Sequence, residues 1–228
     1  MYTQNRRRLL GIFDALVEFM QSLVMYSFDF TKLIGIPSYG IAIILLTIVI
    51  KAILAPLTVK QIKSMRGMQA LQPKIKELQK KYKNDPKKLQ EEMGRLYKEL
   101  GINPLSGCLP LLVQMPFLIA IFYALRDFPY EAGYEAFLWL PNLSVPDHLY
   151  ILPVLSALST YVMSKQSGSA ASGGAAAGQQ KIMQIFMPLF IGYISLNFAS
   201  GLVIYWVVSN IFQMIQQFFI YRNDNKEI

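Results

Sequence analysis

The chain has 228 residues, of which 54% are hydrophobic and only 16% are charged, and this composition excludes an ordinary soluble domain. Lysine and arginine (22) outnumber aspartate and glutamate (14), so the net charge is +8 and contact with anionic surfaces is favoured. A single cysteine, Cys108, and a single histidine, His148, exclude an intramolecular disulfide and a zinc site of three or four such ligands. We therefore expect an all-α membrane protein with several spans, without a metal or another cofactor.

The N-terminal segment, residues 1–37, contains an amphipathic pattern between Leu9 and Phe28. Acidic residues interrupt its apolar run, which favours a helix lying in the membrane interface over a sixth span. Three arginines, Arg6 to Arg8, conflict with an external position of this segment, because positive charge collects on the cytoplasmic side of membranes. A sixth span would remove that conflict, so both alternatives stay open.

Five later runs approach the length of a membrane span, about 20 residues at 1.5 Å each for a hydrocarbon core of about 30 Å. They are Ser38–Leu57, Gly107–Leu125, Leu149–Gln166, Ile182–Ala199 and Gly201–Tyr221. The third run is the most polar and, with the fourth, the shortest. Only a few residues separate the last two runs, which predicts a tight antiparallel hairpin.

The loops between these runs differ in charge, and the difference orients the chain. Pro56–Ser106 holds 12 basic and 5 acidic residues, whereas Arg126–His148 holds one basic and four acidic residues. By the positive-inside rule the first loop is cytoplasmic and the second is external. Five spans then place the N-terminus outside and the C-terminus in the cytoplasm. Residues 167–180 are of low complexity and predict a flexible cytoplasmic loop without a site of its own.

The cytoplasmic segment, residues 58–106, predicts a basic helical hairpin. An apolar face recurs at Leu71, Ile75, Leu78 and Tyr82, and Pro73 predicts a kink or a new helix start. Asn84-Asp85-Pro86 is a helix-start signal, and Gly101 ends the second helix. The lysines expected to form its charged surface are Lys74, Lys76, Lys80, Lys81, Lys83, Lys87 and Lys88.

A basic surface of this kind attracts anionic lipids, ribosomal RNA or acidic protein faces. Lipid contact, or membrane orientation alone, is the simpler explanation. No motif for specific nucleic-acid recognition is present.

Lys51 lies inside the first apolar run, where an ammonium costs about 2.5–3.5 kcal/mol on insertion scales. Such a residue usually faces a partner or a wet cavity. The alternative is that its long side chain bends to the nearer interface. The predicted spans offer no carboxylate partner, so water, Gln114 or an acidic ligand would have to solvate the charge.

Other polar residues inside the spans are candidates for a hydrated groove with Lys51. They are Gln114 in the second run, Ser156, Ser159 and Thr160 in the third, and Trp206 and Asn210 in the last. The competing interpretation is structural, because such side chains commonly bond their own helix or a neighbouring helix.

Three stretches resemble the YidC/Oxa1/Alb3 family of membrane protein insertases. They are NPLSGCLPLLVQMPFLIAIFYAL at Asn103–Leu125, MQALQPKIKELQKKYKNDPKKLQEEMGRLYKELGINPL at Met68–Leu105, and GLVIYWVVSNIFQMIQQ at Gly201–Gln217. The resemblance implies five transmembrane helices, an external interfacial amphipathic helix, a cytoplasmic hairpin, and a groove open to cytoplasm and lipid. The family usually has arginine at the position that Lys51 matches, and lysine keeps the charge but loses the bidentate fork.

The function implied is a non-enzymatic insertase and chaperone in a bacterial plasma membrane. Its expected partners are nascent membrane proteins, anionic lipids, the ribosome and the Sec translocon. Two alternatives remain: a small anion channel or carrier with Lys51 as the binding charge, and a structural partner of the translocon.

Overall fold

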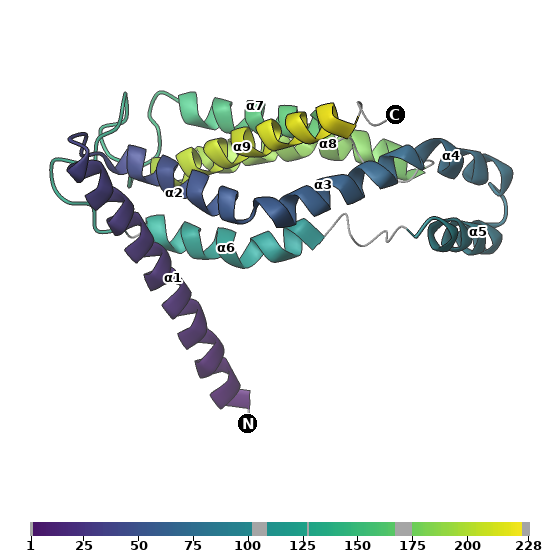
Figure 1. Cartoon of the computed structure of the whole chain (residues 1–228), viewed down its shortest axis with the longest axis horizontal. Helices are drawn as coiled ribbons and strands as arrows, with labels where there is room; N and C mark the ends of the chain where they lie inside the picture. The colour runs from purple at the N-terminus through teal and green to yellow at the C-terminus, as the bar shows by residue number, and fades with distance from the viewer. Residues whose placement is uncertain (1, 102–108, 127, 167–174, 225–228) are drawn as a thin grey trace.

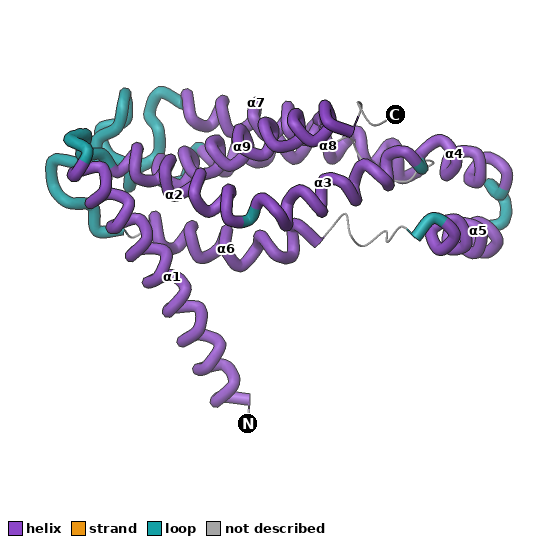
Figure 2. Tube along the Cα trace, in the orientation of Figure 1, coloured by secondary structure: helices purple, strands orange, loops and turns teal. Residues whose placement is uncertain are grey.

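A computed structural model of the chain describes residues 2–101, 109–126, 128–166 and 175–224. In these ranges the regular structure is helical, and the only extended pairing is one bridge between Phe137 and Leu140 (Figure 2). The helices form an elongated bundle, with loops gathered at one end and the pair α4 and α5 at the other (Figure 1). The expected all-α class is confirmed.

The first helix, α1 (Tyr2–Leu33), contacts the bundle from Phe13 onward, where the Phe13 ring lies 5.5 Å from the ring of Tyr123 on α6. Met20, Val24 and Phe28 repeat at a spacing of four and are buried, and this face packs against α2 and α6. The N-terminal end extends away from the other helices (Figure 1). A helix therefore covers the predicted stretch Leu9–Phe28 and continues to Leu33, while its position in the membrane interface stays a prediction.

A sharp bend separates α2 (Tyr39–Ile53) from α3 (Ala55–Ala70), with an angle of 61° between their axes. Ser38 caps α2 by accepting a hydrogen bond from the amide of Ile41. Pro56 explains the bend, because it has no N–H for the carbonyl four residues earlier and its ring crowds that carbonyl. A continuous helix over the whole predicted run Ser38–Leu57 is therefore wrong.

The basic segment contains α4 (Gln72–Lys81) and α5 (Pro86–Glu99), as the hairpin prediction requires. Asp85 caps α5 by accepting from the amide of Lys88 at 3.0 Å. Gly101 follows α5 with a φ of +62°, a conformation that glycine adopts without strain. The prediction missed that α3 continues through Ala70, so the segment holds most of a third helix as well.

Four helices complete the bundle: α6 (Leu109–Arg126), α7 (Ile151–Gln166), α8 (Ala175–Ser195) and α9 (Ser200–Asp224). In the described part of the chain α7 packs against both α8 and α9, and these two contact each other less than either contacts α7. The turn between α8 and α9 is short, as expected, but the closely packed hairpin is not formed.

The loop predicted at residues 167–180 is only partly tested. Residues 167–174 lie outside the described residues. Residues 175–180 belong to the first turns of α8, so the prediction of a flexible loop is wrong for them.

The loop of residues 128–150 closes one end of the bundle. The Phe137 ring lies on the backbone of α2 at Gly40, so close that a Cβ there would be 2.1 Å from a ring atom. The buried Asp147 fastens the start of α7, accepting hydrogen bonds from the amides of Leu149 and Leu152 and from the Trp139 indole. These contacts fix the loop on both α2 and α7.

Among the described residues, one helix is long and apolar enough to cross a bilayer, Ser200–Arg222 within α9. The bent pair Tyr39–Ile53 and Ala55–Lys63 is a second if the two parts form one span. The other predicted spans stay predictions.

Candidate functional site

Lys51 lies on the buried face of α2, less than one turn before the bend, and only 9% of its surface is exposed. Thr47, one turn earlier on the same face, is buried as well and donates to the carbonyl of Ile43. No described side chain forms an ion pair or hydrogen bond with the Lys51 ammonium. The side chain is enclosed by protein rather than extended over the exposed face of α2, which argues against snorkelling.

Four polar side chains join α7 to α9, and we call Ser159, Thr160, Trp206 and Asn210 the α7–α9 polar cluster. The Asn210 amide donates to Ser159 Oγ at 3.1 Å and to Thr160 Oγ1 at 3.0 Å. The Trp206 indole N–H donates to the same Thr160 oxygen at 3.2 Å. The sequence analysis singled out these four residues for a hydrated groove; the structure brings them together, and the groove itself stays a prediction.

Ser156 belongs to a different contact. Its hydroxyl donates to Ser195 Oγ on α8 at 3.0 Å, and Ser195 in turn donates to the carbonyl of Ile191. Ser156 is therefore part of the α7–α8 interface, where Gly192 also allows close packing against Ala157. No described hydrogen bond joins Ser156, Ser159 or Thr160 to Lys51, and the hydrated groove that they were expected to line with Lys51 stays a prediction. The side chain of Gln114 lies outside the described residues.

Lys51 and the α7–α9 polar cluster nevertheless lie at a similar depth in the bundle. α2 and α9 pack side by side and run in the same direction, with Ile43 Cδ1 only 3.2 Å from where a Cβ on Gly201 would be (Figure 1). Lys51 follows Ile43 by eight residues and Asn210 follows Gly201 by nine, distances of about 12 and 13.5 Å along the helices. A layer of polar groups thus crosses α2, α9 and α7 at this depth.

Three buried polar residues were not singled out by the sequence analysis. They are Thr47, Ser195 and Gln217. Thr47 precedes Lys51 by four residues and Gln217 follows Asn210 by seven, so helical spacing places each on the face of a residue already identified. Ser195 gives no such signal.

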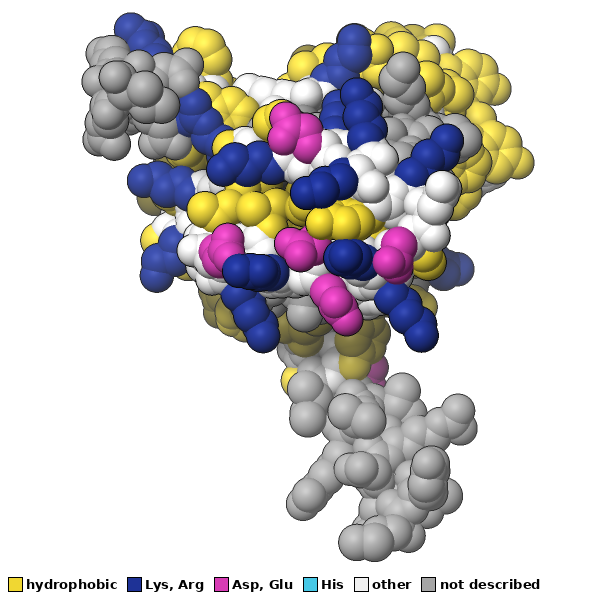
Figure 3. Space-filling model, turned by 90° about the vertical axis from the view of Figure 1, so that its right-hand side faces the viewer, with side chains coloured by type: hydrophobic (Ala, Val, Ile, Leu, Met, Phe, Trp, Pro, Cys, Tyr) yellow, Lys and Arg dark blue, Asp and Glu magenta, His cyan; other side chains and the backbone are white. Residues whose placement is uncertain are grey.

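The seven hairpin lysines are all exposed, from Lys74 to Lys88. Figure 3 shows lysine and arginine side chains spread over the end of the molecule that carries α4 and α5, with fewer acidic side chains between them. Lys81 and Lys88 lie over the ring of Tyr82 at the hairpin turn, 5.4 and 5.7 Å from its centroid. α5 contains no fully buried residue, so α4 and α5 together present a wide, solvated, positively charged surface.

In the part of the chain that the structure describes, no three His, Cys, Asp or Glu side chains are grouped so that they could hold a metal ion. The arrangement offers a buried cation and polar hydrogen-bonding groups inside a helical bundle, and a cationic surface at one end.

Comparison with known proteins places these features in a family. The family described as 60Kd inner membrane protein matches residues 29–227 of the chain. A protein of Clostridium perfringens named membrane protein insertase YidC is 45% identical over 213 residues, which cover 92% of this chain and 86% of that protein. A protein of the same name from Actinobacillus pleuropneumoniae is 41% identical over 213 residues, 93% of this chain but only 36% of its own length.

A solved structure is similar as well. The crystal structure described as an active YidC insertase with the first transmembrane domain resolved superposes with a TM-score of 0.63 at 31% identity. The match covers 90% of this chain and 45% of that one. The chain thus spans most of the clostridial relative and less than half of the longer ones.

Proposed function

Because the chain belongs to the 60Kd inner membrane protein family, we propose that it is a membrane protein insertase of the bacterial plasma membrane. It would transfer hydrophobic proteins into the bilayer without making or breaking a covalent bond. The observation that carries this function is Lys51, a cation buried within an apolar helix without a carboxylate partner among the described residues. A structural helix contact does not require such a charge, whereas a path for polar groups does.

The proposed membrane arrangement has five spans, formed by the bent pair α2–α3 and by α6, α7, α8 and α9. In this arrangement α1 lies in the external interface, residues 128–150 are outside, and α4, α5 and the C-terminus are cytoplasmic. The loop charges support it, with 12 basic and 5 acidic residues in Pro56–Ser106. The exposed apolar side chains of α1, among them Phe19, Met25 and Tyr26, support its contact with lipid.

In the proposed mechanism Lys51 and the α7–α9 polar cluster keep water in the cytoplasmic half of the bundle. Water at that depth shortens the apolar distance that the short polar or acidic tail of a substrate has to cross. The substrate helix then moves into lipid, driven by burial worth about 25 cal/mol per Å² of apolar surface. The free-energy barrier to insertion comes from moving the polar tail through the apolar core of the membrane. Attraction between Lys51 and an acidic tail lowers this barrier.

The partners follow from the same arrangement. Nascent membrane proteins are the substrates. The exposed lysines of α4 and α5 would contact anionic lipid headgroups and, during synthesis, the ribosome. The Sec translocon would deliver or receive some substrates.

The test is insertion of a single-spanning substrate with a short acidic tail into sealed proteoliposomes, measured as protection of the translocated tail from protease. The attraction between two opposite unit charges 4 Å apart is worth about 1 kcal/mol in water and about 4 kcal/mol near a protein surface. Lys51→Ala should therefore slow insertion about tenfold or more. Lys51→Arg, which keeps the charge, should retain most of the activity.

The matched control is Lys60→Ala, which removes an exposed lysine from α3. Normal insertion by Lys51→Ala would contradict the electrostatic role. Rapid anion flux through the same vesicles, without tail protection, would instead identify a channel or carrier.

A further inference from the structure

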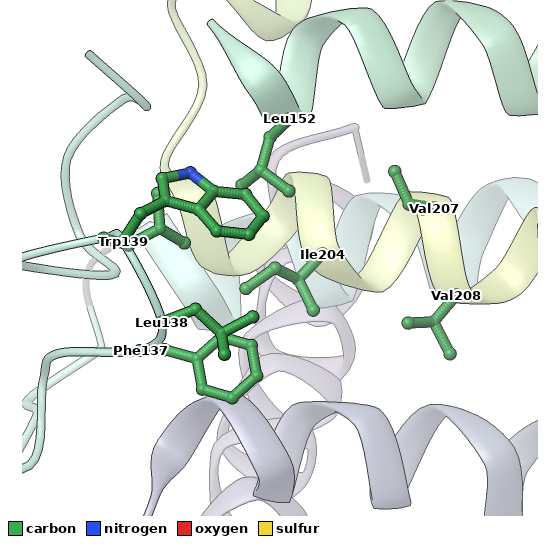
Figure 4. A pocket seen from close by; sticks show the side chains of 8 residues that line it. Phe137, Leu138, Trp139, Leu152, Ile204, Val207 and Val208 are labelled. Atoms are coloured by element: carbon green, nitrogen blue, oxygen red, sulfur yellow. The ribbon is translucent and has the colours of Figure 1, made fainter. Parts of the chain in front are cut away.

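An apolar cavity of about 130 Å³ lies at the loop end of the bundle. Its walls come from the loop, from the first turn of α7 and from α9, as Figure 4 shows. The lining residues are Phe137, Leu138, Trp139, Leu140, Leu152, Ile204, Val207 and Val208. The cavity is separate from the α7–α9 polar cluster, because none of the four cluster residues lines it.

The chemistry of the walls excludes a polar occupant. No polar atom contributes to the cavity surface. The indole N–H of Trp139 is bonded to Asp147, and the backbone groups of Phe137 and Leu140 bond each other. Water requires two to four polar partners, and a peptide backbone brings its own N–H and C=O groups to satisfy, so neither fits. A hydrocarbon chain requires no partner.

The surroundings connect the cavity to surfaces that meet lipid in the proposed arrangement. Leu138 lines the cavity and is 75% exposed, although its φ of +53° is rare for a branched residue. Val154 and Leu155, in the turn of α7 that follows Leu152, are exposed too. A lipid chain could enter from this side without crossing a polar surface.

We propose that this cavity binds the acyl chain of a phospholipid from the outer leaflet, and that the chain holds the loop turn at Leu138 and Trp139 against α7 and α9. The inference rests on the proposed membrane arrangement. An empty cavity forfeits van der Waals contacts along its walls, and an inserted acyl chain restores them. Apolar cavities of about 150 Å³ are known to remain dry and to accept a benzene-sized molecule, so the volume is adequate for several methylene groups.

Trp139 reports on the occupant directly. The chain has two tryptophans, so Trp206→Phe leaves Trp139 as the only one. This variant is reconstituted into vesicles whose phospholipids carry bromine near the middle of the acyl chain, and its fluorescence is compared with that in unbrominated vesicles. Strong quenching by bromine and weak quenching by aqueous iodide are expected. The opposite order would overturn the proposal without any further variant.

A cavity-filling substitution isolates the bound chain from surrounding lipid. Val208→Phe, added to Trp206→Phe, should lose most of the bromine quenching. Ile211→Phe adds the same ring at an exposed position of α9 and should keep it. Equal quenching in the two variants, or loss of quenching only when a hydrophobic substrate is added, would overturn the proposal. Failed insertion by the protein with Trp206 intact, while Trp139 quenching persists in Trp206→Phe, would refute the proposed function alone.

Discussion

Asn210 is the central residue of the α7–α9 polar cluster, because its amide bonds two hydroxyl groups on α7. Interhelical hydrogen bonds in membranes are worth about 0.6 kcal/mol on average and up to about 1.7. Asn210→Ala should therefore lower the free energy of unfolding by about 1–3 kcal/mol, since it also leaves a small cavity. Ile211→Ala, at the next and lipid-facing position, should have little effect.

The measurement is unfolding of the purified protein in mixed micelles with increasing denaturing detergent. Equal midpoints for Asn210→Ala and Ile211→Ala would show that the cluster does not hold the two helices together.

Tyr130 makes the stability of the loop depend on alkaline pH. Its hydroxyl is buried without a hydrogen-bond partner among the described residues, and burial raises the pKa of the phenol. The unfolded chain loses this proton near pH 10, whereas the folded chain holds it. The resulting contribution to stability is complete below about pH 10 and is lost as the pH rises through the folded pKa.

Tyr130→Phe should weaken this alkaline loss. At neutral pH it should be neutral or stabilising by about 1 kcal/mol, because an unsatisfied buried hydroxyl is removed. Thermal unfolding at pH 8 and above pH 10 checks both effects, and a variant as sensitive to alkali as the parent would contradict them. Lys32 also favours the folded state less at alkaline pH, since its hydrogen bond to Glu131 raises its pKa. Its contribution to stability is small because the pair is exposed.

At the scale of the elements, the junction of the loop with α2 depends on Gly40. A methyl group at this position would meet the Phe137 ring at 2.1–2.6 Å, so the ring and its loop would have to move. Gly40→Ala should destabilise the protein by about 1–3 kcal/mol despite the better helix propensity of alanine. For a chain of this size each kcal/mol lowers the melting temperature by about 2–4 °C.

Gly94→Ala on α5 is the matched control, since nothing lies within 4 Å of its added methyl group. It should stabilise by about 0.5–1 kcal/mol, the ordinary gain from replacing glycine within a helix. Differential scanning calorimetry separates the two variants, and a gain of similar size at Gly40 would refute the contact with Phe137.

The bend between α2 and α3 illustrates what sequence patterns miss at this scale. Hydropathy depends on composition alone, and the run from Ser38 to Leu57 is apolar on both sides of Lys51. The direction of the helix changes at one residue, Leu54, because of one side chain, Pro56. The hairpin was better predicted, because its start and stop signals at Asp85 and Gly101 act within a single turn.

For the whole molecule, the residue types of the candidate site were predictable and their pairing was not. A buried charge and several hydroxyl groups in apolar runs are visible in the sequence. Which helix each hydroxyl faces depends on packing between distant segments. In the folded protein Ser156 bonds a residue of α8, whereas Ser159 and Thr160 bond a residue of α9. The exposed and buried sides of α2 were also undetermined, because branched apolar residues such as Ile43 and Val49 occur on both.

The central claim is that Lys51 holds water inside the bundle, and accessibility of position 51 tests it most directly. Lys51→Cys and Val49→Cys are prepared in a Cys108→Ser background and labelled with a membrane-impermeant maleimide from the cytoplasmic side. The two positions differ little in depth, but Val49 is 53% exposed on the outer face of α2 and Lys51 is 9% exposed inside the protein. Rapid labelling at 51 and protection by lipid at 49 are expected. Equal protection at both positions would contradict it, because the interior around Lys51 would then be dry.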